Sequence, residues 1–230
     1  PLWKGLLIRA AAVLIALILS DIVISAAAPK SQGFFGFFGA LFSGAFGTER
    51  RIWLLFQDTF LLLGVAVALV VAFKMKFWNL GGNGQILMGC LACAICLKYL
   101  GGKLPDPLVW LIMLAASLAA GALWAVIPAI FKAFFNTNES LFTLMMNYIA
   151  MYLVAFFISY WYPGGTGAMS PLTEGVLPPL GEGQMGKSLL PILLFAVVTA
   201  AIYLYLRFSK HGYEVALIGD SKNTARYAGI

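Results

Sequence analysis

Charged side chains are scarce in this sequence. Only 10% of its 230 residues are Asp, Glu, Lys or Arg, whereas a soluble domain carries roughly 25%. So few charges cannot cover a surface that faces water, which excludes an ordinary soluble domain. Hydrophobic residues make up 62% of the chain, and they fall in long runs rather than in the alternating or one-sided patterns of soluble strands and helices. The sequence therefore predicts an all-α membrane protein.

Groups suited to catalysis or metal binding are also few. His211 is the only histidine, and it has no evident partner in the sequence. Cys90, Cys93 and Cys96 share the two-residue spacing of an iron–sulfur motif, but the sequence has no fourth cysteine and no proline after the third. Because their flanks are apolar, we interpret them as small residues on a packed helix face. We expect no catalytic residue, cofactor or metal in this chain.

The basic residues do not indicate a nucleic-acid-binding protein. The formal net charge is +6, but Lys and Arg are scattered singly between apolar runs instead of forming one stripe. Cytoplasmic loops of membrane proteins are enriched in Lys and Arg, so this distribution predicts topology. With the N-terminus inside, the inner segments hold Lys4, Arg9, Lys74, Lys76, Lys132, Arg207, Lys210, Lys222 and Arg226. The outer segments hold Lys30, Arg50, Arg51, Lys103 and Lys187.

The apolar runs predict a polytopic bundle of about six transmembrane helices. The first run could pass for a signal peptide, but its length favours a retained helix. Residues 34–47 are too few to span a membrane and predict an interfacial or re-entrant element. Ala115, Ala119, Gly121 and Ala122 predict close approach of another helix to the fourth span. The expected spans are 5–28, 52–73, 86–100, 108–131, 141–161 and 189–208, and the loop 163–188 is expected outside.

A first polar segment, 79–85, contains Asn79, Asn83 and Gln85 together with three glycines. Glycine permits backbone conformations that a helix forbids. A helix broken at membrane depth exposes amides and carbonyls that can bind a polar solute. The segment is therefore either the broken first half of the third span or an ordinary cytoplasmic turn. The first alternative would give the short run 86–100 the length to cross the membrane.

A second polar segment lies at the start of the fifth span. Routine helix capping explains Asn138 and the acidic Glu139 in the first turn. Asn147 is different, because it lies about two turns into an apolar span. There its amide must find a partner on another helix or in a water-filled path. We name six candidates for a substrate pathway: Asn79, Asn83, Gln85, Asn138, Glu139 and Asn147.

A third polar segment is the tail, 209–230. Gly212 and Gly219 are expected to punctuate short amphipathic pieces, and residues 223–229 have the small and basic side chains of a surface helix. Such a segment can dock in a groove on a cytoplasmic partner. The alternative is a solvated loop.

At these three segments the sequence resembles the permeases of ABC importers for simple sugars, branched-chain amino acids and, most closely, nucleosides. Two positions depart from the nucleoside subgroup: Asn83 stands where Glu is usual, and Ala216 stands where a basic residue is common. The first change removes a charge from the predicted pathway. The matching residues are Asn79, Leu80, Gly81, Gly84, Gln85 and Gly89; Asn138, Glu139, Thr143, Met146, Asn147 and Tyr148; and Gly212, Tyr213, Glu214, Gly219 and 225–230.

The resemblance implies a permease subunit with no enzymatic activity of its own. Two permease subunits would enclose the pathway, two ABC ATPases that bind ATP and Mg would drive it, and an extracytoplasmic binding protein would deliver the substrate. Residues 1–230 would be one permease domain, a fragment of a larger permease, in the bacterial inner membrane with a cytoplasmic N-terminus. Residues 209–230 would be the cytoplasmic coupling segment. Its expected ATPase contacts are Gly212, Tyr213, Glu214, Gly219, Ala225, Arg226, Tyr227 and Gly229.

Three alternatives also fit parts of the pattern. Within the same family, the solute could be a simple sugar such as ribose or a branched-chain amino acid. In another class, an ion-coupled secondary transporter would need a functional acid inside the membrane, for which Asp21 and Asp58 are the candidates. In a non-transporting membrane scaffold, the polar segments would be only turns and caps.

Overall fold

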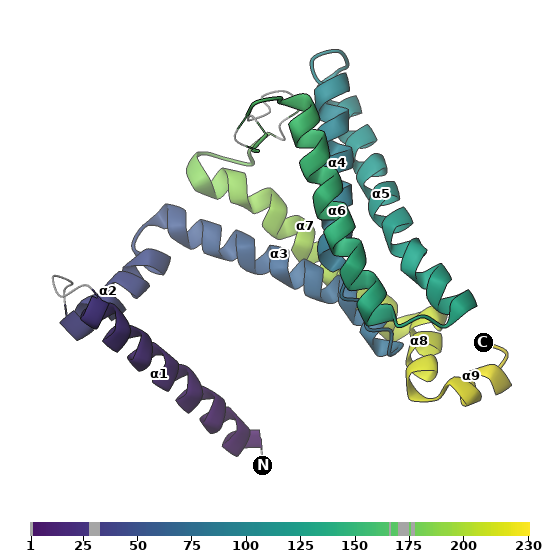
Figure 1. Ribbon diagram of the computed structural model, residues 1–230, viewed down its shortest axis with the longest axis horizontal. Coiled ribbons are helices and arrows are strands. Elements are labelled where there is room, and N and C mark those ends of the chain that lie inside the picture. Colours follow the sequence, from purple (N-terminus) through teal and green to yellow (C-terminus); the bar gives the residue numbers. More distant parts are fainter. Residues whose placement is uncertain (1, 28–32, 166, 170–174, 176–177) are drawn as a thin grey trace.

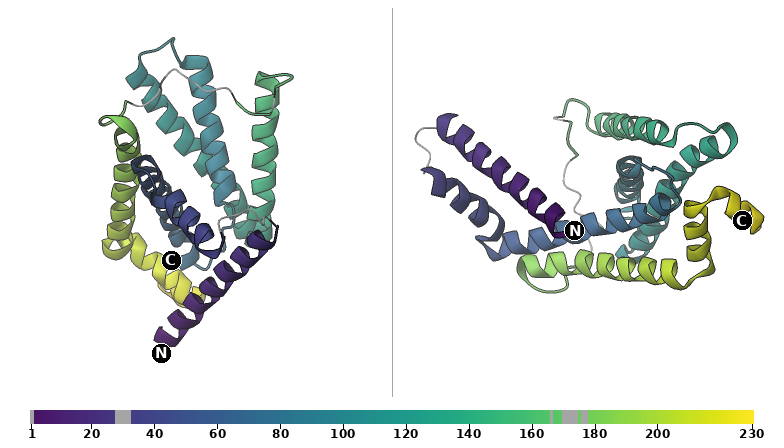
Figure 2. Two further views of the ribbon diagram at one scale, coloured as in Figure 1. Left: turned by 90° about the vertical axis from the view of Figure 1, so that its left-hand side faces the viewer. Right: turned by 90° about the horizontal axis from the view of Figure 1, so that it is seen from below.

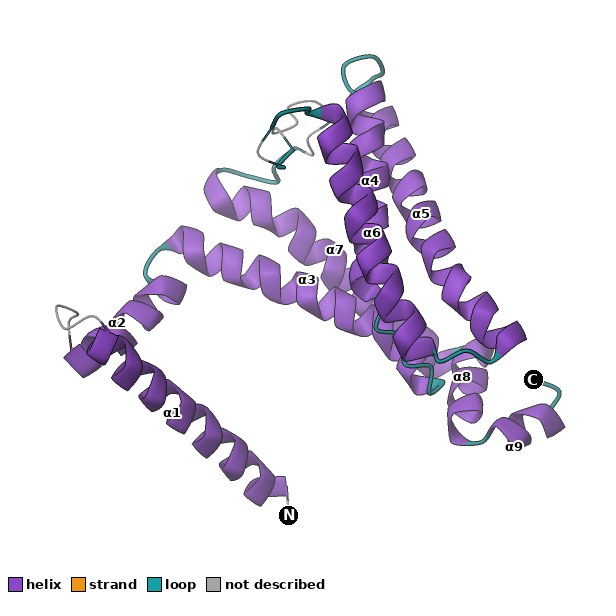
Figure 3. Cartoon of the chain, in the orientation of Figure 1, coloured by secondary structure: helices purple, strands orange, loops and turns teal. Residues whose placement is uncertain are grey.

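The computed structural model describes residues 2–27, 33–165, 167–169, 175 and 178–230. These residues form helices and connecting loops, with no strand among them (Figure 3). Six of the helices are long and apolar enough to cross a membrane, which confirms the predicted fold class. They are α1 (Leu2–Ala27), α3 (Glu49–Lys74), α4 (Gly82–Leu100), α5 (Asp106–Phe135), α6 (Glu139–Trp161) and α7 (Gly183–Phe208).

Three shorter helices complete the described chain. Helix α2 (Gly33–Phe46) has 14 residues and is therefore only about 21 Å long, less than the roughly 30 Å of a hydrocarbon core. The prediction of a non-spanning element at 34–47 is confirmed in this respect. Helices α8 (Lys210–Asp220) and α9 (Lys222–Tyr227) follow the last span.

The spans pack in layers (Figures 1 and 2). Helix α3 packs along α7, α4 packs along α5, and α6 packs on α4. Helix α1 contacts α2 and stands apart from the other five spans in Figure 1. Helix α8 contacts the ends of α7 and α3. The α3–α4 and α5–α6 connections lie on the same side of the molecule as α8, and we call this side the α8 end (Figure 1).

Helix α7 begins at Gly183, six residues before the expected start of the sixth span. The prediction was wrong there because Gly, Gln, Lys and Ser make its first turns look like loop. Ser188 is fully buried, and its hydroxyl donates a 2.9 Å hydrogen bond to Gln57 Oε1 on α3. These polar turns form a helix because Ser188 pairs with the polar side chain of Gln57 on α3. Of the predicted spans and loops, residues 28, 30, 166, 170–174 and 176–177 lie outside the described part.

The connection between α5 and α6 is shorter than predicted. Residues 132–140 were expected to form a polar link, but α5 continues to Phe135 and α6 begins at Glu139. Asn136 ends α5 in the left-handed region at φ 48°, a conformation that asparagine tolerates better than most residues. The link is thus a tight turn that sets α6 beside the end of α5.

Candidate functional site

The start of α4 is hydrogen-bonded to α6 through two polar side chains. The Leu80 N–H donates to Thr143 Oγ1 at 3.1 Å, and Asn147 Nδ2 donates to the Leu80 carbonyl at 2.8 Å. The Gly84 N–H donates to Asn147 Oδ1 at 2.7 Å. The first N–H groups of a helix have no partner within that helix. Asn147 therefore acts as a cap for α4, supplied by a residue far away in the sequence.

Glycine at position 84 is required by this contact rather than by backbone conformation. A Cβ there would lie 2.9 Å from Asn147 Oδ1 and 3.0 Å from Trp124 Nε1. Gly81, Gly82 and Gly84 are not among the glycines with positive φ, so none of them adopts the left-handed conformation that glycine permits. The two alternatives for the segment 79–85, a first part of the third span and a turn, each describe one part of it. Its first part is a loop, and α4 starts at Gly82 as a regular helix.

The six predicted pathway residues do not form one cluster. Asn79 Oδ1 accepts a 2.9 Å hydrogen bond from the Gly81 N–H, and Asn83 is exposed on the first turn of α4. Asn138 caps α6 by accepting from the Leu141 N–H at 3.2 Å. These partners give Asn79, Asn138 and Asn147 structural roles. A pathway role for the six residues stays a prediction.

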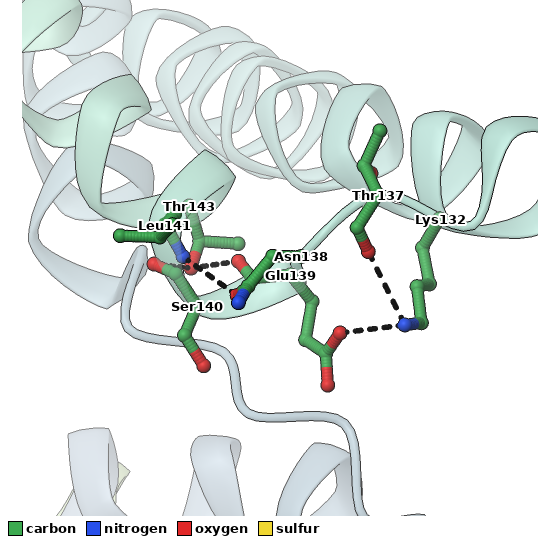
Figure 4. Close-up of polar contacts among 7 residues, drawn as sticks. All are labelled: Lys132, Thr137, Asn138, Glu139, Ser140, Leu141 and Thr143. Carbon is green, nitrogen blue, oxygen red and sulfur yellow. Dashed lines mark hydrogen bonds and ion pairs between the residues drawn. The ribbon is translucent and has the colours of Figure 1, made fainter.

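Glu139 forms an ion pair across the α5–α6 turn (Figure 4). Its Oε2 lies 2.8 Å from Lys132 Nζ, and the same ammonium donates to the Thr137 carbonyl at 3.2 Å. Both charged side chains are partly buried. Glu139 is therefore an acid at a helix start that also holds the preceding helix in place. The sequence indicated the capping but not the ion pair.

A groove with a volume of about 890 Å³ lies between the α3–α7 layer and the α4–α5 layer. Gln85 is the one predicted pathway residue among its lining residues. Helices α4 and α5 lie close together along this groove, since a Cβ at Gly121 would lie 3.5 Å from the Gln85 carbonyl oxygen. The predicted close approach to the fourth span is confirmed at Gly121. Ser117 and Phe195 also line the groove, and no sequence pattern pointed to either of them.

The three cysteines lie along α4. Cys96 is buried, and Cys93 Sγ lies 3.9 Å from the Met113 carbonyl oxygen of α5. Helix packing is therefore confirmed for these two residues. Both Cys90 and Cys93 line the groove, and Cys90 is exposed, so the prediction of a packed face does not hold for Cys90.

Helix α8 is held tightly against the ends of two spans. A Cβ at Gly219 would overlap the Lys74 carbonyl oxygen at the end of α3, and a Cβ at Gly212 would overlap the Leu206 carbonyl oxygen of α7. Helix α8 runs through both glycines, so the expectation that they punctuate short pieces was wrong. They serve close packing. Because neither glycine has a side chain, α8 can pack directly against the backbone of α3 and α7.

The other predicted coupling residues differ in how exposed they are. Tyr213 is 66% exposed and Tyr227 is 95% exposed, whereas Ala225 is only 3% exposed. His211 does have a partner, because its Nδ1 lies 3.1 Å from Glu214 Oε2. Arg226 and Gly229 are exposed beyond α8. The surface that a partner could reach is therefore formed by the tyrosines and Arg226 rather than by Ala225.

The sequence of residues 51–230 matches the family profile of the branched-chain amino acid transport system permease component. This chain belongs to that permease family. The match includes both the α4–α6 junction and α8, so the two features described above are parts of a permease. It also makes the chain a multi-pass membrane protein, in agreement with its six spans.

Three relatives show how the permease family varies. The guanosine ABC transporter permease of Bacillus subtilis is 30% identical over 84% of this chain and 56% of its own length. The glucose ABC transporter permease of Haloferax volcanii is 31% identical over 74% of this chain and 47% of its own length. The nucleoside ABC transporter permease of Lactococcus lactis is 27% identical over 83% of this chain and 55% of its own length.

The chain thus spans about half the length of the curated relatives it matches. No solved structure shows a significant match to it.

Proposed function

We propose that this chain is part of the permease subunit of an ATP-driven ABC importer for nucleosides or related compounds. The observation that carries the proposal is α8, a short helix fixed against the ends of α3 and α7, with Tyr213 exposed on it and Tyr227 exposed at the end of the following α9. A helix attached in this way moves together with the spans. A partner that pushes on the exposed side would therefore reorient α3 and α7.

A continuous path of contacts joins α8 to α6. Gly219 lies against the Lys74 carbonyl oxygen, where α3 ends. A few residues later the chain reaches Leu80, which is hydrogen-bonded to Thr143 and Asn147. Movement of α8 would be passed to α6 through these bonds, which supports alternating access driven from the α8 end.

The proposed partners are two ABC ATPases that bind ATP and Mg, a second permease subunit and an extracytoplasmic substrate-binding protein. ATP hydrolysis would occur in the ATPase, so this chain would not be an enzyme. The proposed location is the bacterial inner membrane with the N-terminus and the α8 end in the cytoplasm. The distribution of Lys and Arg supports this orientation.

The names of the relatives support the choice of solute. Two of them are named for guanosine or nucleoside transport. A simple sugar is the second candidate, because a relative of equal identity is named for glucose. Branched-chain amino acids are the third, since the family description names them.

Uptake by reconstituted vesicles tests the function. The full-length permease, its ATPase and its binding protein are expected to take up labelled guanosine only with ATP. Unlabelled nucleosides should compete, and glucose and leucine should not. An ATPase variant that cannot hydrolyse ATP is the control. Uptake driven by an ion gradient without ATP, and lost in Asp21→Asn, would contradict the proposal in favour of a secondary transporter.

The coupling role is tested by a pair of substitutions in α9. Tyr227→Ala removes an exposed side chain, so it should reduce ATP-driven uptake about tenfold or more without changing thermal stability. Ala225→Asp would bury a charge within the chain itself and should lower stability as well. Unchanged uptake in Tyr227→Ala would contradict a role of Tyr227 in docking.

A further inference from the structure

Two tyrosines lie in the middle third of α6 and are exposed on the chain. Tyr148 is 55% exposed and Tyr152 is 72% exposed. Tyr148 comes nine residues after the first residue of α6, and Tyr152 nine residues before the last. At 1.5 Å per residue, each lies about 13 Å from the nearer helix end. Both hydroxyls are thus placed deep within the hydrocarbon thickness of a membrane.

The two tyrosines share one face of α6 with Met145 and Phe156. These four residues recur at intervals of three or four, which places them on one side of a helix, and all four are exposed. The opposite side packs on α4 through buried residues such as Ala150. In Figure 2 α6 lies on the outside of α4, so the face is not covered by another described helix.

Lipid is a poor neighbour for this face. A tyrosine hydroxyl in hydrocarbon lacks a hydrogen-bond partner, which is unfavourable. Among the described residues, the side-chain hydrogen bonds at α6 are made by Asn138, Thr143, Asn147 and Trp161, and none of them involves Tyr148 or Tyr152. The other tyrosines of the spans, Tyr99, Tyr160, Tyr203 and Tyr205, lie near helix ends, where aromatic residues meet the membrane interface.

The exposed face of α5 has the side chains expected of a lipid-facing surface. Eight and twelve residues after the first residue of α5 it carries Leu114 and Leu118. Leu118 is 65% exposed, close to the value for Tyr152. At similar exposure and depth, the α5 face presents leucines that suit lipid, whereas the α6 face presents hydroxyls that need a polar partner.

The chemistry of the α6 face defines what it can bind. Glu139, at the first position, is the only charged residue of the helix, so the face offers no ionic partner to a phosphate, a carboxylate or an ammonium group. It does offer flat aromatic rings and hydroxyls. Aromatic rings stack on planar heterocycles, whichever base is present. Hydroxyls can both donate to and accept from ring heteroatoms.

We infer that the face formed by Met145, Tyr148, Tyr152 and Phe156 is a wall of the solute pathway, and that the two tyrosines stack with an uncharged planar heterocycle such as a nucleobase. This inference rests on the proposed importer function. It separates nucleosides from the other candidate solutes, because a sugar has no flat ring system and an amino acid is charged at both ends.

Thiol labelling tests whether the face is in contact with water. In the full-length permease with Cys90, Cys93 and Cys96 replaced by Ala, Met145→Cys is compared with Leu118→Cys on α5. A charged, membrane-impermeant thiol reagent is expected to modify Met145→Cys much faster than Leu118→Cys. If both cysteines are labelled equally slowly, this face is not a wall of the pathway, whatever the solute.

Protection by solute tests the stacking. Guanosine should slow labelling of Met145→Cys, and ribose should not. Adding Tyr152→Ala should raise the guanosine concentration for half protection about tenfold, whereas Tyr152→Phe, which keeps the ring, should change it little. Equal protection by ribose, or none by guanosine in a permease that imports it, would overturn the stacking role. Failure of the unmodified permease to import any nucleoside would instead contradict the proposed function, which uptake measures separately.

Discussion

Helix α6 has polar side chains on two sides, and they differ in what surrounds them. On the side that packs on α4, Thr143 and Asn147 have their polar atoms paired with the backbone of Leu80 and Gly84. On the other side, Tyr148 and Tyr152 are exposed. Paired polar groups inside a bundle fix helices in place, whereas unpaired ones at membrane depth need a polar partner from outside the helix pair. One helix thus combines a structural face with a face suited to function.

At the α4–α6 junction, the largest expected effect on stability is at the glycine that touches Asn147. Gly84→Ala places a Cβ 2.9 Å from Asn147 Oδ1 and 3.2 Å from its Cα, and backbone atoms cannot move aside easily. We expect a loss of about 2 to 3 kcal/mol in unfolding free energy. Thermal unfolding of the detergent-solubilised permease measures it. Gly82→Ala is the matched control, because its Cβ would lie 3.6 Å from a Leu69 methyl group, an ordinary contact.

Removing the cap itself should have the next largest effect. Asn147→Ala leaves the Gly84 N–H and the Leu80 carbonyl without side-chain partners. We expect a loss of about 1 to 2 kcal/mol, since hydrogen bonds between membrane helices are individually modest. Asn147→Asp keeps an acceptor for Gly84 but places a carboxylate oxygen against the Leu80 carbonyl, so it should be no more stable than Asn147→Ala. Equal stability of all three proteins would show that the cap contributes nothing.

The ion pair at the α5–α6 turn should matter less. Glu139→Gln removes the charge from a partly exposed pair, 2.8 Å apart, and should cost at most about 1 kcal/mol because solvent screens it. The cost should shrink at high salt. The control is Lys210→Gln, whose side chain is 87% exposed and 3.7 Å from Glu214. A larger loss in the control than in Glu139→Gln would contradict this ranking.

Changes on the outer face should hardly affect stability. Tyr152→Phe removes only a hydroxyl without a protein partner, so unfolding should stay within about 0.5 kcal/mol of wild type. A clear loss of stability would mean that the hydroxyl is bonded to protein in the complete assembly. That result would remove the contrast between the two faces of α6.

Some of the site was predictable from local pattern. Asn147 stood out because an amide inside an apolar run needs a partner, and Asn138 and Glu139 because capping residues precede a span. Thr143 lies four residues before Asn147, which places both on one side of a helix, and this spacing could have indicated a shared partner. The partner itself lies 63 residues earlier than Asn147, and nothing in the spacing identifies it.

Other features could not be predicted because their explanation lies in contacts. Gly84, Gly212 and Gly219 suggested flexible or broken helices, yet each lies where another helix comes too close for a Cβ. Gly183–Ser188 looked like loop because its polarity is matched only by Gln57 of α3. Ala225 looked like part of a docking surface, but folding buries it.

The sequence by itself determined the membrane, the helical class and the six spans, because lipid cannot hydrogen-bond to the backbone and its thickness sets the length of each apolar run. The tertiary structure decided which polar residues serve the fold and which stay open. Packing brings Asn147 to the start of α4 and leaves Tyr148 and Tyr152 on the far side. These roles depend on which helix lies next to each face, and residues close in the sequence do not reveal that.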